Sequence, residues 1–534
     1  SMRQLRVLYV EDEKEWRDLV LHVLERKEYL AQAASSLQEA QALLGQKLYH
    51  LLIIDMHLDD QQKDAIAGLH LLDQLIDEGT RSSYGAIILT GHPTLETQHR
   101  AFKEQKVLDF LWKKTFSPKT FATAVADLIP KLEINLDLKI HWGPKLKSPE
   151  SAVRGLRLGP GRIARSGESK LGARAGEELD DLLCRLFHEA SEVVLEPLGD
   201  GRSNTQVLLA QPSYSEKGAG TPLVVKFGDA HNIEDEAERY KEWVGRFIGG
   251  GRSTRLNVHR RTTLLGGLCY SLVGSGGESF TSLGEALRQG SLDRRRQILE
   301  NLFSSTCANW YSNCTREMID LTAEYPDSLR FTKESMQGAF EKSRAMIQGR
   351  ETLKLQRLKV DRTFLNPLDL LDHSLTFDTF RCTSHGDLIG DNVVVDDGGA
   401  TWLIDFQRTG PGHILRDFAQ LDAALRLRLL LPAEATLEER LALEEALLEC
   451  DRFADLSELR LESDNKRLAD TFELCRFIRS LAGEQLAKPR DDFREYQAAS
   501  FFHSLNYVRF FDNAKALREH AFLSAALFAG KLTA

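Results

Sequence analysis

Short apolar runs alternate with helical patterns over residues 5–130. The runs are RVLYV, HLLIID, AIILT and VLDFLW, and amphipathic stretches such as LHLLDQLI lie between them. Strands that are separated by helices usually form a parallel sheet with right-handed crossovers. We therefore expect residues 1–130 to form one doubly wound α/β domain of ordinary size.

The pattern changes after residue 130. Residues 139–174 carry repeated Gly, Pro and Ser, with nine Lys or Arg against two acidic residues. This composition predicts a loosely packed linker, followed by a connecting helix up to residue 190. Strand patterns around one helix dominate residues 191–278, whereas residues 279–534 are mostly helical with a hairpin near 393–406. We expect these two segments to form an α+β region.

Composition narrows the class of protein. At 534 residues the chain exceeds what one hydrophobic core usually organises, and its 42% hydrophobic and 28% charged residues are typical of globular domains. A net charge of -10 argues against nucleic-acid binding. Seven widely spaced cysteines form no zinc or disulfide pattern, no apolar stretch is long enough to span a membrane, and no signal peptide is apparent. We expect a cytoplasmic protein.

Charged side chains follow the predicted strands of the first domain. Glu11 and Asp12 follow the first strand, Asp55 the third, Thr90 the fourth and Lys113 the fifth. Ligands of such sheets bind at the carboxyl ends of the strands. Three carboxylates repel one another unless a cation such as Mg²⁺ lies among them. Asp55 can then attack a phosphoryl group, Lys113 can neutralise its charge, and Thr90 can donate a hydrogen bond to it.

Each of these residues is common in solvated loops, and their combined order favours a site. The arrangement resembles the response-regulator receiver family over about residues 5–130, which implies a flavodoxin-like fold. The resemblance implies that Asp55 accepts phosphate from a sensor histidine kinase. It implies a magnesium site formed by Glu11, Asp12 and Asp55. It implies a switch formed by Thr90, Phe110 and Lys113. Lys114 stands where the family usually has proline, so the local bend is expected to differ.

The segment TSHGDLIGDNVVVDDGGATWLIDFQRTG holds a second candidate site. Its Asp-Gly-Gly turn predicts that NVVVD and TWLID pair as a hairpin. This pairing brings Asn392 close to Asp405 at the open end, and Asp387 lies on the preceding loop. An amide oxygen and a carboxylate can hold Mg²⁺ on ATP phosphates, while a second carboxylate accepts the proton of an attacking hydroxyl.

Two upstream features fit phosphate chemistry. Gly199, Gly201 and Ser203 lie in a glycine-rich turn that can bring backbone N–H groups to a phosphate, although a plain hairpin is the alternative. Lys226 interrupts an apolar strand and needs an anionic partner, unless it reaches solvent at a sheet edge. Glu236 shares the apolar face of the next helix and is the expected partner.

The spacing from Asp387 to Asn392 and the Ile-Asp-Phe ending resemble the catalytic and metal-binding loops of the kinase superfamily, and His-Gly-Asp is closest to aminoglycoside and choline phosphotransferases. The resemblance covers about residues 191–534. It implies a two-lobed protein-kinase-like fold, with a small lobe at 191–278, a helical lobe at 279–534, ATP between them and a hinge near 272–277. Asp417 matches an aspartate that braces the catalytic loop, although a helix cap is equally open.

These features predict an ATP- and Mg²⁺-dependent phosphotransferase that is regulated by the receiver and acts on a hydroxyl of an unknown small molecule or protein. The expected catalytic residues are Asp387, Lys226 and Glu236. The alternative is a non-catalytic, nucleotide-binding pseudokinase or scaffold. It ranks lower because Lys226, Asp387, Asn392 and Asp405 are all present. A DNA-binding response regulator is disfavoured because no basic helix-turn-helix pattern accompanies the receiver.

Overall fold

The computed structural model describes residues 3–58, 66–158, 170–199, 205–247, 252–277, 279–342, 352–354, 363–486, 492–510 and 514–534. The chain divides into two compact units. The first unit comprises Ser1–Ala237 and Leu256–Ser271, and the second comprises Glu238–Arg255 and Leu272–Ala534. The hinge expected at 272–277 thus begins where the second unit resumes.

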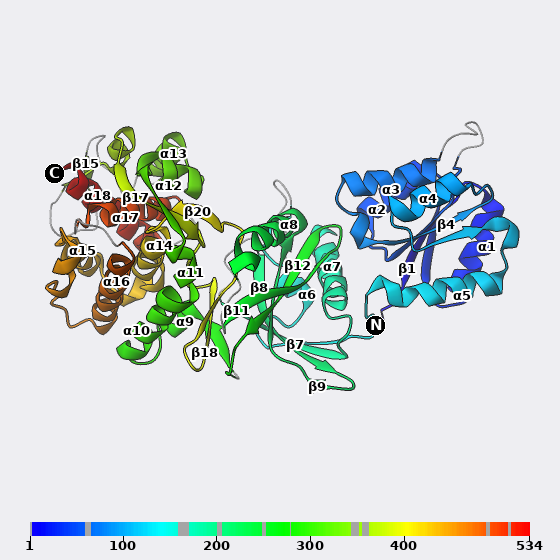
Figure 1. The fold of residues 1–534 in the computed structure, drawn as a ribbon, viewed down its shortest axis with the longest axis horizontal. Helices are drawn as coiled ribbons and strands as arrows, with labels where there is room; N and C mark the ends of the chain where they lie inside the picture. Colours follow the sequence, from blue (N-terminus) through cyan, green and yellow to red (C-terminus); the bar gives the residue numbers. More distant parts are fainter. Residues whose placement is uncertain are drawn as a thin grey trace. The chain divides into compact units, whose positions relative to one another are not determined.

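The N-terminal domain is a five-stranded parallel sheet with helices on both faces (Figure 1). Its strands, in the order β2-β1-β3-β4-β5, are β1 (Arg6–Val10), β2 (Leu30–Ala34), β3 (Leu51–Ile54), β4 (Gly85–Thr90) and β5 (Asp109–Trp112). Its helices are α1 (Lys14–Glu25), α2 (Leu37–Gln46), α3 (Ala67–Asp77), α4 (Leu95–Lys103) and α5 (Pro118–Leu128). Leu8 and Val10 of β1 pack against α2 and α3, whereas Val7 and Tyr9 pack against α1 and α5. Both faces are therefore buried, as the unbroken apolar strands predict.

A second sheet of seven strands completes the first unit, in the order β11-β12-β10-β8-β7-β6 with β9 beside β8. These strands are β6 (Lys139–Trp142), β7 (Glu192–Pro197), β8 (Thr205–Tyr214), β9 (Gly218–Ala219), β10 (Leu223–Asp229), β11 (Ser253–Arg261) and β12 (Leu265–Val273). The helices are α6 (Pro149–Ala152), α7 (Lys170–Leu186) and α8 (Ala230–Arg239). Strands β8, β10 and β12 are antiparallel neighbours, which places β10 in the interior of the sheet.

The segment expected to be a loosely packed linker is instead part of this second domain. Strand β6 pairs in parallel with β7, and Leu138, Val153 and Leu156 share a buried core with Leu179 and Leu182 of α7. Gly and Pro break the segment into short elements, while its apolar residues are spaced so that they reach one core. Composition alone therefore concealed a folded segment, and residues 159–169 lie outside the described residues.

Helix α7 contacts the N-terminal domain through buried charges. His50 Nε2 lies 2.6 Å from Asp181 Oδ1, and Arg185 bonds Asp181 Oδ2 at 2.7 Å and the carbonyl oxygen of Ser83 at 2.8 Å. His50 Nδ1 accepts a hydrogen bond from Arg6 N, so Nε2 carries the proton that is donated to Asp181. His50 and Ser83 precede β3 and β4, so this contact lies at the amino end of the parallel strands. The carboxyl ends, including Asp55, lie at the opposite edge.

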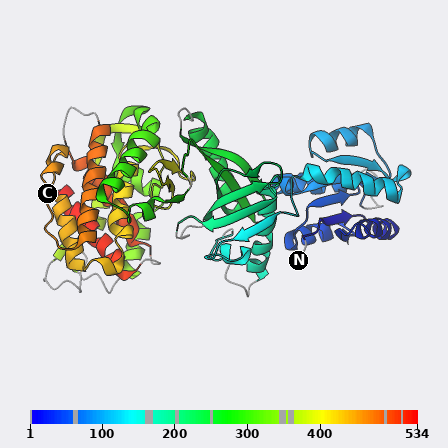
Figure 2. The same ribbon diagram turned by 90° about the horizontal axis from the view of Figure 1, so that it is seen from below.

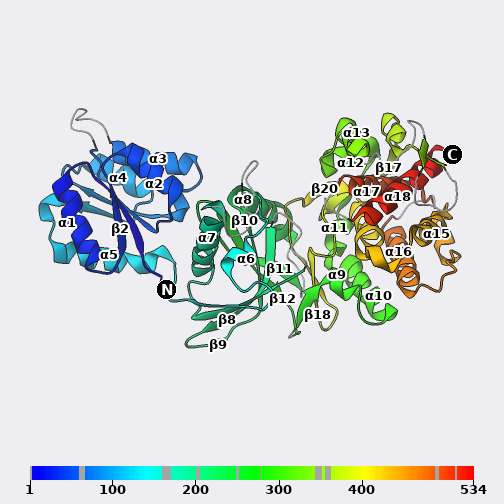
Figure 3. The same cartoon turned by 180° about the vertical axis from the view of Figure 1, so that it is seen from behind.

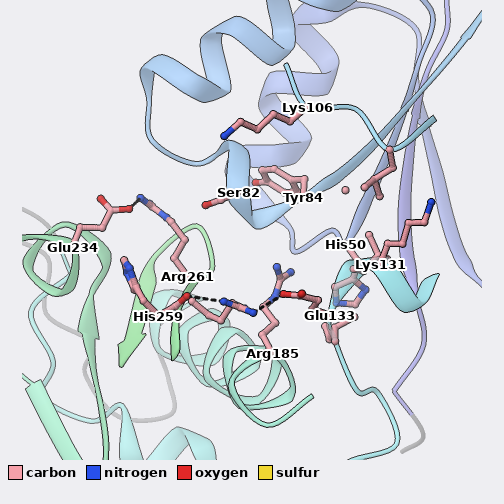
Figure 4. A pocket seen from close by; sticks show the side chains of 15 residues that line it. His50, Ser82, Tyr84, Lys106, Lys131, Glu133, Arg185, Glu234, His259 and Arg261 are labelled. Carbon is pink, nitrogen blue, oxygen red and sulfur yellow. Dashed lines mark hydrogen bonds and ion pairs between the residues drawn. The ribbon is translucent and has the colours of Figure 1, made fainter. Parts of the chain in front are cut away.

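A cavity of about 420 Å³ lies beside this contact (Figure 4). Lys106 and Lys131 of the N-terminal domain line it, together with Arg261 and Glu234. Arg261 Nη1 donates to Glu234 Oε1 at 2.5 Å, so the carboxylate offsets part of the positive charge. The junction of the two domains is therefore polar rather than a continuation of either hydrophobic core.

The second unit is mainly helical. Its helices are α9 (Leu283–Ala286), α10 (Leu292–Asn301), α11 (Ala308–Ser312), α12 (Leu321–Leu329), α13 (Lys333–Lys342), α14 (Arg416–Ala424), α15 (Leu437–Leu448), α16 (Lys466–Gln485), α17 (Arg494–Val508) and α18 (Lys515–Thr533). Its short strands are β13 (Phe280–Ser282), β14 (Cys314–Asp320), β15 (Thr352–Lys354), β16 (Thr363–Leu365), β17 (Thr376–Ser384), β18 (Val393–Asp396), β19 (Thr401–Leu403) and β20 (Gly410–His413).

The C-terminal helices form the core of this unit. Helix α17 packs against both α14 and α18, and Figures 2 and 3 show these helices, coloured yellow to red, lying side by side. Strands β14, β17 and β20 form one small sheet of this unit, and β13, β18 and β19 form another. None of the helices among the described residues combines the length and apolar character of a membrane span.

Candidate functional site

The carboxyl ends of β1, β3 and β5 bring four charged side chains together. One oxygen each of Glu11, Asp12 and Asp55 lies within 4.8 Å of the other two. Lys113 Nζ lies 2.6 Å from both Asp55 Oδ2 and Glu11 Oε2. The parallel sheet thus places the predicted acidic residues and Lys113 in one cluster, at the edge where ligands of this fold bind.

Burial controls the electrostatics of this cluster. Glu11 is fully buried, and loss of water raises its pKa to about 7, although hydrogen bonds from Lys113 and Tyr9 act in the opposite direction. Burial lowers the pKa of Lys113, but the carboxylates of Asp55 and Glu11 outweigh this and raise it above its ordinary value. The cluster consists of oxygen donors with excess negative charge, which fits Mg²⁺.

Two of the three expected switch residues, Thr90 and Phe110, lie on adjacent strands. Thr90 at the end of β4 is fully buried, and its Oγ1 accepts a hydrogen bond from His92 N at 3.4 Å. Thr90 pairs with Trp112 in the sheet register, so Phe110 lies diagonally across from it on the same face. The following residue pair, Lys113 and Lys114, begins a 3₁₀ turn. Thr90 therefore lies at the carboxyl end of β4, and Phe110 lies on the same face of the neighbouring strand β5.

The second domain holds a buried ion pair. Lys226 in β10 and Glu236 in α8 are 0% and 1% exposed, and the Lys226 ammonium contacts Glu236 Oε2. Tyr270 in β12 donates a hydrogen bond to Glu236 Oε1 at 2.9 Å. A lysine in a central strand cannot reach solvent, so the sheet requires the anionic partner that the helical spacing identified. Tyr270 was not identified from the sequence.

The glycine-rich turn precedes β8. Gly199 has a φ of 84°, in the left-handed region that glycine adopts without strain. The predicted residues Gly201 and Ser203 lie outside the described residues. Their proposed contact with phosphate therefore stays a prediction.

In the second unit, β18 and β19 pair as the predicted hairpin. Val393 lies opposite Leu403, and Ile404 N donates to Asn392 O at 3.0 Å, so Asn392 and Asp405 are neighbours at its open end. Asn392 Nδ2 donates to the carbonyl oxygen of Asp387 at 2.7 Å and to its Oδ2 at 3.2 Å. Asp405 has a φ of 65°. Left-handed backbone is uncommon at residues other than glycine, although Asp adopts it more readily than most.

Asp417 braces the loop that carries Asp387. Its two carboxylate oxygens accept hydrogen bonds from His385 N at 2.9 Å and Gly386 N at 3.0 Å, and Tyr311 Oη donates at 2.9 Å. Asp417 is fully buried inside the first turn of α14, whereas the N-cap position of that helix is Leu415. Asp417 therefore holds the loop and does not cap its own helix.

Gln420 makes a further contact with Asp387 that was not predicted from the sequence. Gln420 Nε2 donates to Asp387 Oδ1 at 3.2 Å, and Gln420 Oε1 accepts from Leu388 N at 3.0 Å. Gln420 follows Asp417 by three residues, so it lies on the same face of α14. That spacing is the one signal that could have identified it.

Two protein-family models match segments of this chain. A model described as the response regulator receiver domain matches residues 7–126. A model described as ternary complex associated domain 9 matches residues 190–341 and 335–502, which together exceed half of the chain. Neither description names a kinase, so phosphotransferase activity stays a prediction. No curated protein matches the chain.

Solved structures resemble the N-terminal domain. The signal receiver domain of an HD domain-containing protein from Pseudomonas fluorescens Pf-5 is 22% identical, with 24% of this chain and 98% of that chain covered and a TM-score of 0.22. A CheY-like receiver domain protein from Methanospirillum hungatei JF-1 is 21% identical, with 24% and 98% covered and a TM-score of 0.22. The HemR receiver domain from Leptospira biflexa is 22% identical, with 24% and 94% covered and a TM-score of 0.21.

The family matches agree with the fold. The five-stranded parallel sheet carries the acidic cluster of a receiver domain of two-component signalling, within residues 7–126. The second sheet and the helical unit account for the longer match. The chain therefore belongs to the ternary complex associated domain 9 family, and it carries a response regulator receiver domain in its N-terminal part.

Proposed function

We propose that a phosphorylatable receiver domain in this protein regulates an ATP- and Mg²⁺-dependent phosphotransferase that acts on a hydroxyl acceptor. The observation that carries the proposal is the contact of Asn392 with Asp387, on a loop that Asp417 holds, at the open end of the β18–β19 hairpin where Asp405 follows Ile404. Carboxylates and an amide oxygen are the groups that phosphoryl transfer uses to bind Mg²⁺ and to accept a proton.

We propose a role for each residue. Asn392 donates a hydrogen bond from Nδ2 to Asp387, so the amide oxygen of Asn392 remains for a cation. The carboxylate of Asp405 binds the same cation. Asp387 accepts the proton of the acceptor hydroxyl. Mg²⁺, when bound, neutralises charge on the ATP phosphates. The Lys226–Glu236 ion pair of the first unit is proposed to bind ATP phosphates.

Regulation begins at the receiver. Asp55 accepts a phosphoryl group from a sensor histidine kinase, and Lys113, which already contacts Asp55, stabilises the added charge. The hydroxyl of Thr90 donates a hydrogen bond to the phosphoryl group. Binding of beryllofluoride, a phosphate mimic, should change the affinity of the full chain for a non-hydrolysable ATP analogue. The Asp55→Asn variant should show no such change, and equal affinities with and without the mimic in the wild type would exclude the coupling.

The catalytic half is tested by Mg²⁺-dependent ATP turnover of the full chain. Asp387→Asn should lower turnover at least about a hundredfold, because the proton acceptor is lost. Asp397→Asn is the matched control, since this exposed aspartate lies at the closed end of the same hairpin. Equal turnover by the wild type and Asp387→Asn would exclude Asp387 as the base.

A second candidate function is a non-catalytic module of a larger complex. The description of the family, a ternary complex associated domain, favours it. This candidate predicts ATP binding by the full chain without Mg²⁺-dependent turnover toward water or any hydroxyl acceptor.

A further inference from the structure

Helix α14 holds the Asp387 loop through a second side chain, one turn beyond Asp417. Gln420 is 6% exposed, and its amide bonds the loop at two points, Leu388 N at 3.0 Å and Asp387 Oδ1 at 3.2 Å. Residues three apart share a helix face. Asp417 therefore fixes the backbone before Asp387, and Gln420 fixes the backbone after it together with the carboxylate itself.

The contacts determine how the Gln420 amide is oriented. A backbone N–H only donates, so the atom that faces Leu388 N must be the carbonyl oxygen of Gln420. The NH₂ group consequently faces Asp387. Rotating the amide by a half turn would place an oxygen against a carboxylate and an NH₂ against an N–H, which are both repulsive. The donor to Asp387 is thus set by the backbone of the loop.

The carboxylate of Asp387 receives an amide N–H on each oxygen. Gln420 of α14 donates to Oδ1, and Asn392 of the hairpin donates to Oδ2 at 3.2 Å. Donors on both oxygens fix the rotation of the carboxylate.

We propose that Gln420 is a positioning residue for Asp387, an inference that rests on the proposed phosphotransferase function. It holds the proton-accepting carboxylate of Asp387 in one rotamer. Asn392 alone cannot do this, because a single donor leaves the other oxygen able to rotate away.

Two substitutions separate positioning from folding. Gln420→Leu removes both hydrogen bonds at similar volume. Gln420→Glu keeps an acceptor for Leu388 N but replaces the donor with a second carboxyl beside Asp387. The turnover of ATP with water as the acceptor is measured on the full chain at neutral pH and divided by the folded fraction. The control is Gln497→Leu, because Gln497 is 3% exposed and donates to the carbonyl oxygen of Cys450 at 2.8 Å.

Positioning predicts a distinct kinetic pattern. Gln420→Leu should lower kcat between about tenfold and a hundredfold with the KM for ATP within about twofold of wild type. Gln420→Glu should lower kcat as well, because the second carboxyl repels Asp387 although Leu388 N keeps its acceptor. Gln497→Leu should keep the wild-type kcat and KM.

The other outcomes identify which idea fails. An unchanged kcat in both Gln420 variants, with Asp387→Asn inactive, would overturn the positioning role and leave the proposed function intact. Equal turnover by the wild type and Asp387→Asn, or none by either, would overturn the proposed function and this inference with it.

Discussion

Replacing Lys226 by methionine isolates the energetic role of the buried ion pair. The pair lies between β10 and α8 with both side chains at most 1% exposed. Methionine fills a similar volume, so the change removes the ammonium and leaves the Glu236 carboxylate in place with its hydrogen bond from Tyr270. Removal of one partner of a buried pair typically costs about 3–5 kcal/mol.

The cost can also be worked out from protonation. Glu236 can relieve its buried charge in the variant by taking up a proton, and for a carboxyl of ordinary pKa near 4.3 this costs about 3.7 kcal/mol at pH 7. The two routes agree on a loss of about 4 kcal/mol. A carboxyl that prefers its protonated form when folded loses stability as the pH rises above its unfolded pKa. The loss should therefore shrink by about 2 kcal/mol between pH 7 and pH 5.5.

Hydrogen exchange of peptides within residues 223–237 measures the free energy of local opening of this region. A local measurement is needed because a chain with two units need not unfold in one step. The double variant Lys226→Met/Glu236→Gln should lose less than about 1.5 kcal/mol at both pH values, since no charge is buried. Lys217→Met, at an exposed turn of the same sheet, should change stability by less than about 0.5 kcal/mol. A loss for Lys226→Met that is below about 1 kcal/mol, or is independent of pH, would refute the reasoning.

Three further outcomes are expected. Burial lowers the pKa of His503 to about 3, below its unfolded value, so the free energy of unfolding of the second unit should fall by about 2 kcal/mol from pH 7 to pH 5 in the wild type. Urea titrations should show a smaller fall in His503→Asn. An equal pH dependence of stability in the wild type and the variant would contradict this prediction. Gly386→Ala should destabilise this unit by at least about 2 kcal/mol in the same assay, because φ is 81° and the added methyl lies 2.2 Å from the carbonyl oxygen of Arg408. The control is Gly338→Ala in α13, where the added methyl meets nothing within 4 Å, so this variant should be neutral or stabilising. Of the seven cysteines, Cys314 alone is exposed, so a thiol reagent should modify one group rapidly under native conditions, and two fast groups would contradict this.

Local rules predicted much of both sites. The Asp-Gly-Gly turn fixed the hairpin register, and this register placed Asn392 beside Asp405. The rule that ligands bind at the carboxyl ends of parallel strands predicted the acidic cluster around Asp55. The burial of Lys226 in an apolar strand predicted an anionic partner, which is Glu236. In each case the geometry follows from a turn, a strand end or a helical spacing, all of which are written within a few residues.

Contacts between distant segments were not predictable in this way. The linker expectation failed because composition does not record that Leu138 and Leu156 meet α7 in one core. His50 and Asp181 are 131 residues apart, and Gln420 lies 33 residues from Asp387. No periodicity of the chain relates such pairs, so only the packing of complete elements brings them together.

The sequence by itself determined the order of the elements, the hairpin and the residue types at the strand ends, because these depend on sterics and on the spacing of apolar side chains. Tertiary structure decided which charges are buried. Arg426, two residues beyond the end of α14, is fully buried and bonds Asp422 and Glu444 at 2.6 Å each. A charge can leave water only where a distant opposite charge meets it, and that meeting is a property of the whole fold.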